Sequence, residues 1–129
     1  MEKNRLKYIQ ILIVISVLAT LFHVLILVGV IPFEITWGGR LKTVNEMYVF
    51  ETLSILINSF FIFVLAQKAE IVRNIFGKKA VTIILWIFFV IFVLNTIGNI
   101  FAETTFEKLF TILTLVNALL IWFINKPSK

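Results

Sequence analysis

The sequence predicts an all-α fold: one antiparallel bundle of four transmembrane helices, with both termini in the cytoplasm. Hydrophobic residues make up 60% of the 129 residues, and the mean hydropathy is +1.05. Four apolar runs, at about residues 8–31, 46–68, 80–102 and 106–124, each match the length that a helix needs to cross a hydrocarbon core about 30 Å thick. Short connections make successive helices antiparallel, so residues 1–129 are expected to form a single domain.

The Lys and Arg residues divide unequally between the two sides of the membrane that this topology creates. Three lie near the first and third connections, Arg40, Lys42 and Lys108, and nine lie on the opposite side. The nine are Lys3, Arg5, Lys7, Lys68, Arg73, Lys78, Lys79, Lys126 and Lys129. Cytoplasmic loops carry an excess of basic residues, so this split predicts a multi-pass protein of the plasma membrane with both termini inside. The net charge of +5 then serves orientation and contact with the lipid bilayer, and no nucleic acid is expected as a partner.

Local signals place the ends of each helix. Pro32 is predicted to end the first helix, because proline lacks a backbone N–H and disfavours helix before it. Asn45 is the expected N-cap of the second helix, with Glu46 in its first turn, where the helix dipole favours a negative charge. The segment 67–79 is expected to continue the second helix for a turn or two beyond the bilayer, with Gly77 as a helix stop. A very short connection around 103–106 makes the third and fourth helices a tight hairpin.

Each run carries polar residues three or four positions apart, which places them on one helix face. The four stripes are Ser16, Thr20 and His23; Glu51, Ser54 and Asn58; Asn95, Asn99 and Glu103; and Thr111, Thr114 and Asn117. Because lipid offers no hydrogen-bond partner, the stripes are expected to turn inward together. His23, Glu51, Asn95 and Asn99 are predicted to point into the bundle, within hydrogen-bond or single-water reach of at least one another.

Glu51 is the strongest indication of function. It lies about a turn and a half inside the second helix, where an ionised group costs about 2.5–3.5 kcal/mol on insertion scales. A carboxylate at that depth should be protonated, paired or exposed to water. Glu103, at the end of its helix, and Arg40, on the outer connection, are expected at the mouth of the cavity, whereas Glu107 is expected to be solvated.

These residues predict the binding, and the passage, of a small polar or cationic solute at an outward-facing pocket. Glu51 would hold the charge or a proton, and His23 would tune or relay protons, since its pKa lies near neutrality. Asn58, Asn95 and Asn99 would orient the ligand, although Asn58 also suits a purely interhelical hydrogen bond. Arg40 and Glu103 would gate the mouth. A complete pathway would need a homodimer or a larger homo-oligomer, because four helices form a thin wall.

Two other functions remain open from the sequence. One is an intramembrane enzyme acting on a lipid-soluble substrate, with Glu51 and either His23 or Glu103 as acid and base. The other is a non-catalytic accessory subunit whose polar stripes only lock the bundle. No cofactor is expected, because one His and no Cys do not make a zinc site in a single chain and the chain has no glycine-rich phosphate loop. A Ser-His-Asp catalytic triad is excluded because the chain has no Asp.

Overall fold

The computed structural model describes residues 3–35, 41–101 and 105–127. In these residues the chain is helical and has no strand. The elements are α1 (Lys3–Leu27), the 3-10 turn η1 (Phe33–Ile35), α2 (Val44–Lys68), α3 (Lys78–Ile100) and α4 (Thr105–Asn125). All four α-helices are long and apolar enough to span a membrane, as the sequence predicted.

The first helix is the one whose predicted bounds differ most from the structure. It ends at Leu27, before Pro32, because Gly29 takes a left-handed conformation with φ +87°. Val30 N–H donates to the carbonyl of Leu25 at 2.9 Å, which closes a Schellman motif around the glycine. A residue without a side chain adopts this conformation at little cost, so Gly29 rather than Pro32 terminates α1.

The second helix is capped two residues earlier than predicted. Thr43 is its N-cap, and the Thr43 side chain accepts a hydrogen bond from the backbone N–H of Glu46 at 3.1 Å. Asn45 lies inside the first turn instead. The predicted position of Glu46 in that first turn is confirmed.

The other end of α2 also closes with a Schellman motif, here without a glycine. The helix ends at Lys68, so the predicted continuation beyond the bilayer is wrong, and Gly77 caps the start of α3 instead. Glu70 has φ +61°, and Ile71 N–H donates to the carbonyl of Ala66 at 2.9 Å. Glu70 N–H donates to the carbonyl of Gln67 at 3.1 Å. A side chain in the left-handed region is strained, so Glu70 marks a locally unfavourable turn.

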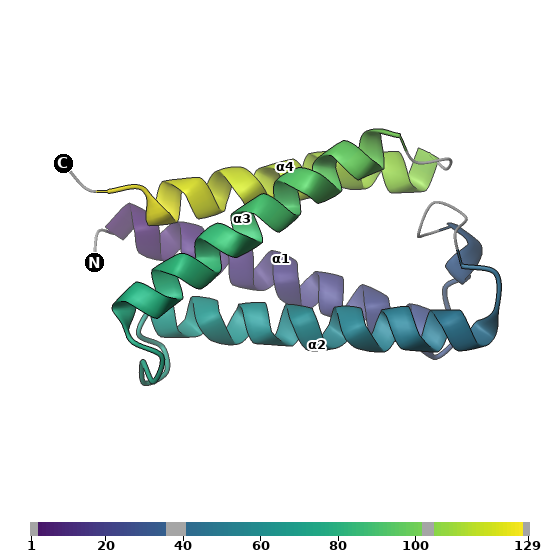
Figure 1. The fold of residues 1–129 in the computed structure, drawn as a ribbon, viewed down its shortest axis with the longest axis horizontal. Coiled ribbons are helices and arrows are strands. Elements are labelled where there is room, and N and C mark those ends of the chain that lie inside the picture. Colours follow the sequence, from purple (N-terminus) through teal and green to yellow (C-terminus); the bar gives the residue numbers. More distant parts are fainter. Residues whose placement is uncertain (1–2, 36–40, 102–104, 128–129) are drawn as a thin grey trace.

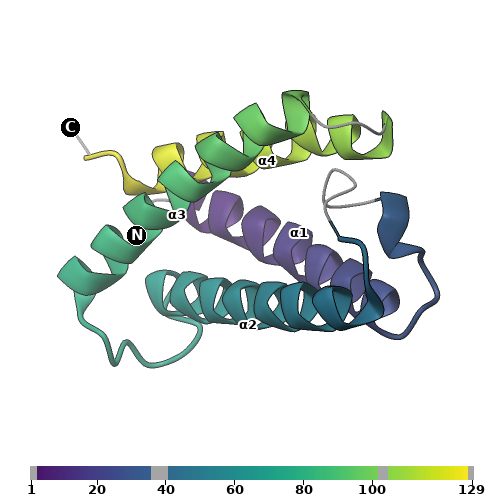
Figure 2. The same cartoon turned by 45° about the vertical axis from the view of Figure 1, so that its right-hand side comes forward.

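The four helices form a ring in which α1 packs mainly on α2, and α3 mainly on α4. Figure 1 shows that the start of α1, the end of α2, the start of α3 and the end of α4 lie at one end of the molecule. We call this the basic end, because Arg5, Lys68 and Lys78 lie there. The opposite end, with Glu51 and Glu107, is called the carboxylate end. Figure 2 shows the α3–α4 pair diverging from the α1–α2 pair toward the carboxylate end.

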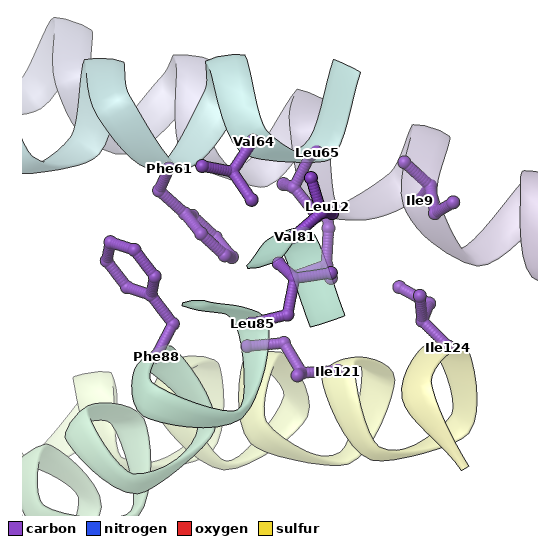
Figure 3. Packing of buried hydrophobic residues seen from close by; sticks show 10 residues of the cluster. All are labelled: Ile9, Leu12, Phe61, Val64, Leu65, Val81, Leu85, Phe88, Ile121 and Ile124. Atoms are coloured by element: carbon purple, nitrogen blue, oxygen red, sulfur yellow. The ribbon is translucent and has the colours of Figure 1, made fainter. Parts of the chain in front are cut away.

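The main hydrophobic core lies toward the basic end and draws on all four helices (Figure 3). Its buried members are Ile9, Leu12, Phe61, Val64, Leu65, Val81, Leu85, Phe88, Ile121 and Ile124. A smaller cluster of Ile26, Leu41 and Met47 lies at the carboxylate end and involves α1, α2 and the segment between them. The large core therefore joins the two helix pairs at one end of the bundle, whereas the small cluster lies within the α1–α2 pair.

Candidate functional site

His23 and Glu51 form a direct hydrogen bond between α1 and α2. The distance from His23 Nδ1 to Glu51 Oε2 is 2.5 Å. The Glu51 side chain is 0% exposed, whereas that of His23 is 25% exposed. Glu51 lies seven residues after the start of α2 at Val44, about 10 Å along the helix axis. The carboxyl group that the sequence placed inside the bundle is thus fully enclosed and bonded to a titratable partner.

A short bond of this kind shares one proton between its two groups. If Glu51 is ionised, His23 Nδ1 carries the proton and donates it to the carboxylate. If Glu51 is protonated, its hydroxyl donates to an unprotonated Nδ1. Either arrangement gives a strong bond, and the ionised one is charge-assisted. In both arrangements one hydrogen bond joins α1 to α2 at this point.

The hydroxyl groups beside this pair bond to their own helices. Thr20 Oγ1 donates to the carbonyl of Ser16 at 2.8 Å, and Ser54 Oγ donates to the carbonyl of Phe50 at 2.8 Å. Bonds to the carbonyl four residues earlier are the usual way in which a helix satisfies such side chains. The polar stripes of α1 and α2 therefore meet through His23 and Glu51 rather than through their hydroxyl groups.

The predicted inward orientation of Asn95 on α3 is wrong. Asn95 is exposed and Asn99 is half-exposed, and neither bonds to another described residue. The polar residue of α3 that faces inward is Thr96, which is buried. Thr96 Oγ1 lies 2.9 Å from Thr114 Oγ1 and donates to the carbonyl of Phe92 at 2.8 Å. One position along a helix is a rotation of about 100°, which moves Asn95 off the face that Thr96 occupies.

Glu107 was predicted to be solvated, and this prediction is wrong: the residue is 4% exposed. It lies in the first turn of α4, one turn before Phe110. The Phe110 ring packs on the Phe22 ring of α1 with centroids 5.5 Å apart, so this face of α4 lies against α1. The sequence did carry a signal, because Glu107 extends the spacing of Thr111 by four residues toward the helix start.

The interior toward the carboxylate end is consequently polar. It contains two buried carboxyl groups, on Glu51 and Glu107, and the buried amide of Asn117 lies further along α4, just past its midpoint. Asn117 Oδ1 and Thr111 Oγ1 are enclosed without a hydrogen-bond partner among the described residues. Buried polar atoms normally have partners, so these two can accept hydrogen bonds from a ligand or from water.

Three other predicted residues stand apart from this arrangement. Asn58 is half-exposed and bonds to no described residue. Arg40 and Glu103 lie outside the described residues. Within the described part of the chain, no three metal-ligating side chains come together. An open, mostly apolar groove runs along α2 and includes none of the predicted site residues; its lining is Tyr48, Val49, Thr52, Leu53 and Leu56.

Comparisons with known proteins add no family to this picture. No family model, no curated protein and no solved structure matches the chain. The fold and the site define a class by themselves: an all-helical protein with four helices able to span a membrane and a buried His–Glu pair between two of them.

Proposed function

We propose that this chain is an integral membrane protein in which the four helices cross the bilayer as an antiparallel bundle. Large apolar side chains on every helix are exposed, as lipid contact would require; examples are Leu18 (60%), Leu56 (63%), Leu94 (61%) and Leu109 (61%). The excess of basic residues at the basic end supports a cytoplasmic location for that end, in the plasma membrane. The carboxylate end then faces outward.

Within this bundle, we propose that the His23–Glu51 pair binds a small polar or cationic solute, with a cation favoured. The observation that carries this proposal is the fully buried carboxyl group of Glu51 in a 2.5 Å bond to His23. Ionisable groups inside membrane helices are expensive to insert and are typically functional. Glu107 adds a second buried carboxyl group at the same end, which favours positive ligands.

The chemistry of binding is an exchange of one charge for another. A cation that approaches the protonated pair takes the place of the shared proton, and the proton leaves to solvent. The charge of the site is the same before and after, so neither state leaves an uncompensated ion in the bundle. Passage across the membrane would require the loaded site to reach the other side, for which we expect a homodimer or a larger homo-oligomer.

Proton release measures this exchange directly. Methylammonium is added to the purified protein in weakly buffered detergent solution, and the pH change is recorded. We expect release of about one proton per bound cation from the unaltered chain and none from Glu51→Gln, which keeps the shape but removes the charge. Glu34→Gln is the matched control, because Glu34 is exposed on η1, and it should release protons normally.

The same variant distinguishes a ligand-binding role of Glu51 from a purely structural one. Glu51→Gln should keep the bundle folded in a thermal unfolding experiment, because no buried charge remains to be accommodated. If Glu51→Gln unfolds while its folded fraction still binds methylammonium, Glu51 is structural, and the accessory-subunit function replaces this proposal. Conversion of a lipid-soluble substrate that requires both His23 and Glu51 would support the enzyme function instead.

The orientation has its own test, because the chain has no Cys. Lys42→Cys and Arg73→Cys each introduce one exposed thiol, at the carboxylate and basic ends respectively. An impermeant thiol reagent applied to intact cells should label the first variant and spare the second. The reverse pattern would place the basic end outside and refute the outward-facing site.

A further inference from the structure

The two helix pairs meet along two seams, one between α1 and α4 and one between α2 and α3. In the α1–α4 seam, the Tyr8 and Phe123 rings lie 5.7 Å apart near the basic end. The Phe22 and Phe110 rings of the same seam lie 5.5 Å apart near the carboxylate end. The α1–α4 seam is therefore joined by aromatic contacts at both of its ends.

The α2–α3 seam is joined by aromatic rings on the side nearer the basic end. The Phe61 ring of α2 lies 4.5 Å from the Phe88 ring and 5.5 Å from the Phe92 ring, both on α3. Phe61 is 0% exposed and Phe88 is 6% exposed, so these rings close the seam where they meet. Figure 2 shows that α2 and α3 diverge from there toward the carboxylate end.

Two turns closer to the carboxylate end, the same faces of α2 and α3 carry polar residues in place of rings. Seven residues make very nearly two helical turns, so residues seven positions apart share a face. The three rings and the polar residues seven positions away from them are Phe61 and Ser54, Phe88 and Asn95, and Phe92 and Asn99. One hydroxyl group and two amides therefore continue the row of rings.

These polar side chains do not bond across the seam to any described residue. Ser54 Oγ donates to a carbonyl of its own helix at 2.8 Å, and Asn95 and Asn99 bond to no described residue. Asn95 is exposed, and Ser54 and Asn99 are half-exposed. The apolar neighbours one turn away, Ile57 (42%) and Ile91 (38%), are exposed as well. The described residues thus leave this part of the seam uncovered.

A seam with this lining is complementary to a molecule that is both polar and apolar. Lipid chains cover exposed isoleucines, but they offer no hydrogen-bond partner to the amides of Asn95 and Asn99. The seam also adjoins the candidate site, because Ser54 lies one turn from Glu51 on α2. A fitting molecule has a polar head that reaches the buried carboxyl group and an apolar chain that lies against the isoleucines.

We propose that the α2–α3 seam admits an amphipathic amine, with one ammonium group and one alkyl chain, from the outer half of the bilayer to the His23–Glu51 pair. The head group is cationic because it meets the carboxyl group of Glu51, where it takes the place of the shared proton. The alkyl chain remains in the seam. The inference rests on the proposed cation binding at Glu51, and it adds the chain and the route to the description of the ligand.

Closing the seam tests this route. Asn95→Phe adds a ring on the face of Phe88, and Leu94→Phe is the matched control, because Leu94 is 61% exposed on another face of α3. Proton release is recorded with octylammonium and with methylammonium. Asn95→Phe should weaken octylammonium binding about tenfold, because the ring occupies the space of the chain, and should leave methylammonium binding unchanged. Leu94→Phe should bind both amines as the unaltered chain does.

The two amines separate failure of this inference from failure of the proposed function. If methylammonium releases no proton from the unaltered chain, cation binding at Glu51 fails, and this inference fails with it. If methylammonium behaves as expected but Asn95→Phe binds octylammonium as the unaltered chain does, only the route through the seam is refuted. Equal weakening of both amines would also refute the route, because the substitution would then act on the carboxyl site itself.

A measurement on the unaltered chain covers the case in which Asn95→Phe does not fold. Octylamine with a photoreactive diazirine at its chain end should label residues 53–57 of α2 and 91–99 of α3, and excess octylammonium should prevent this labelling. Labelling spread over the exposed faces of all four helices would show partition into detergent only and would overturn the proposal. A disulfide-linked dimer of Asn95→Cys, without one of Leu94→Cys, would overturn it too, because a second copy would then cover the seam.

Discussion

The two ends of the bundle are stabilised in different ways. At the basic end, ten buried apolar residues from all four helices pack together, and the Phe61 and Phe88 rings lie 4.5 Å apart. At the carboxylate end, the contacts between helices include the His23–Glu51 bond, the Thr96–Thr114 bond and the Phe22–Phe110 ring contact. A close-packed apolar core resists rearrangement, whereas an interior that contains buried carboxyl groups can accommodate a polar ligand. We infer that the basic end is rigid and call it the rigid base. The carboxylate end, which we call the mouth, can adapt to a ligand.

The largest expected effect comes from breaking the rigid base. Phe61→Ala removes a fully buried ring that contacts both Phe88 and Phe92. We expect a loss of about 3–5 kcal/mol in the free energy of unfolding, as for other buried aromatic truncations. Unfolding by sodium dodecyl sulfate in mixed micelles measures it. Leu94→Ala is the control, because Leu94 is 61% exposed on α3. An equally large loss in that variant would show that the buried core at the basic end does not contribute more to stability than an exposed position.

The second effect sharpens the account of the mouth. His23→Leu and Glu51→Gln, alone and combined, form a double-mutant cycle across the 2.5 Å bond. We expect a coupling of roughly 0.5–3 kcal/mol, because the two residues contact each other directly. The free energies of unfolding of the four proteins give the value. Strict additivity would mean that the bond contributes no net stability and would weaken its role in joining α1 to α2.

The third prediction concerns a strained turn at the basic end. Glu70→Gly relieves the left-handed backbone at φ +61° and should raise the free energy of unfolding by about 1 kcal/mol. Glu70→Ala is the matched control, since it removes the charge but keeps the β-carbon, and it should show no such gain. Equal gains in both variants would assign the effect to charge instead of backbone conformation.

The smallest expected effect separates bonded from unbonded hydroxyl groups on one helix. Thr114→Val removes the contact with Thr96 and should cost about 0.6 kcal/mol, a typical value for hydrogen bonds between membrane helices. Thr111→Val removes a hydroxyl group that has no partner in the described residues, so it should be neutral or slightly stabilising. The same unfolding assay compares them. The opposite ranking would show that Thr111 has a partner that Thr114 lacks.

Much of the fold could be predicted because it depends on local chemistry. The bounds of α2, α3 and α4 agree within two residues with those expected from the apolar runs. The bounds of α1 differ more: the helix begins at Lys3 rather than near residue 8, and Gly29 closes it before Pro32 is reached. Both residues are terminators in principle, and only the Schellman geometry showed which one acts first.

The candidate site was predictable in part. Glu51 and His23 were identified from their chemistry, since a lone carboxylate and a lone histidine in apolar helices need partners. The α3 stripe was assigned to Asn95, Asn99 and Glu103 because these residues are four positions apart, which places them on one helix face. The structure buries Thr96 instead, and it also buries Glu107 in the first turn of α4, a position that the sequence suggested would be solvated.

The sequence by itself determined the four apolar helices, the division of charge between the two ends and the identity of the two residues most in need of a partner. These properties follow from composition and order along the chain. Only the tertiary structure decided how each helix is rotated about its axis, and hence that His23 meets Glu51, that Thr96 replaces Asn95 and that Glu107 is enclosed. A helix repeats every 3.6 residues whatever its surroundings, so the face that turns inward is set by the helices packed against it.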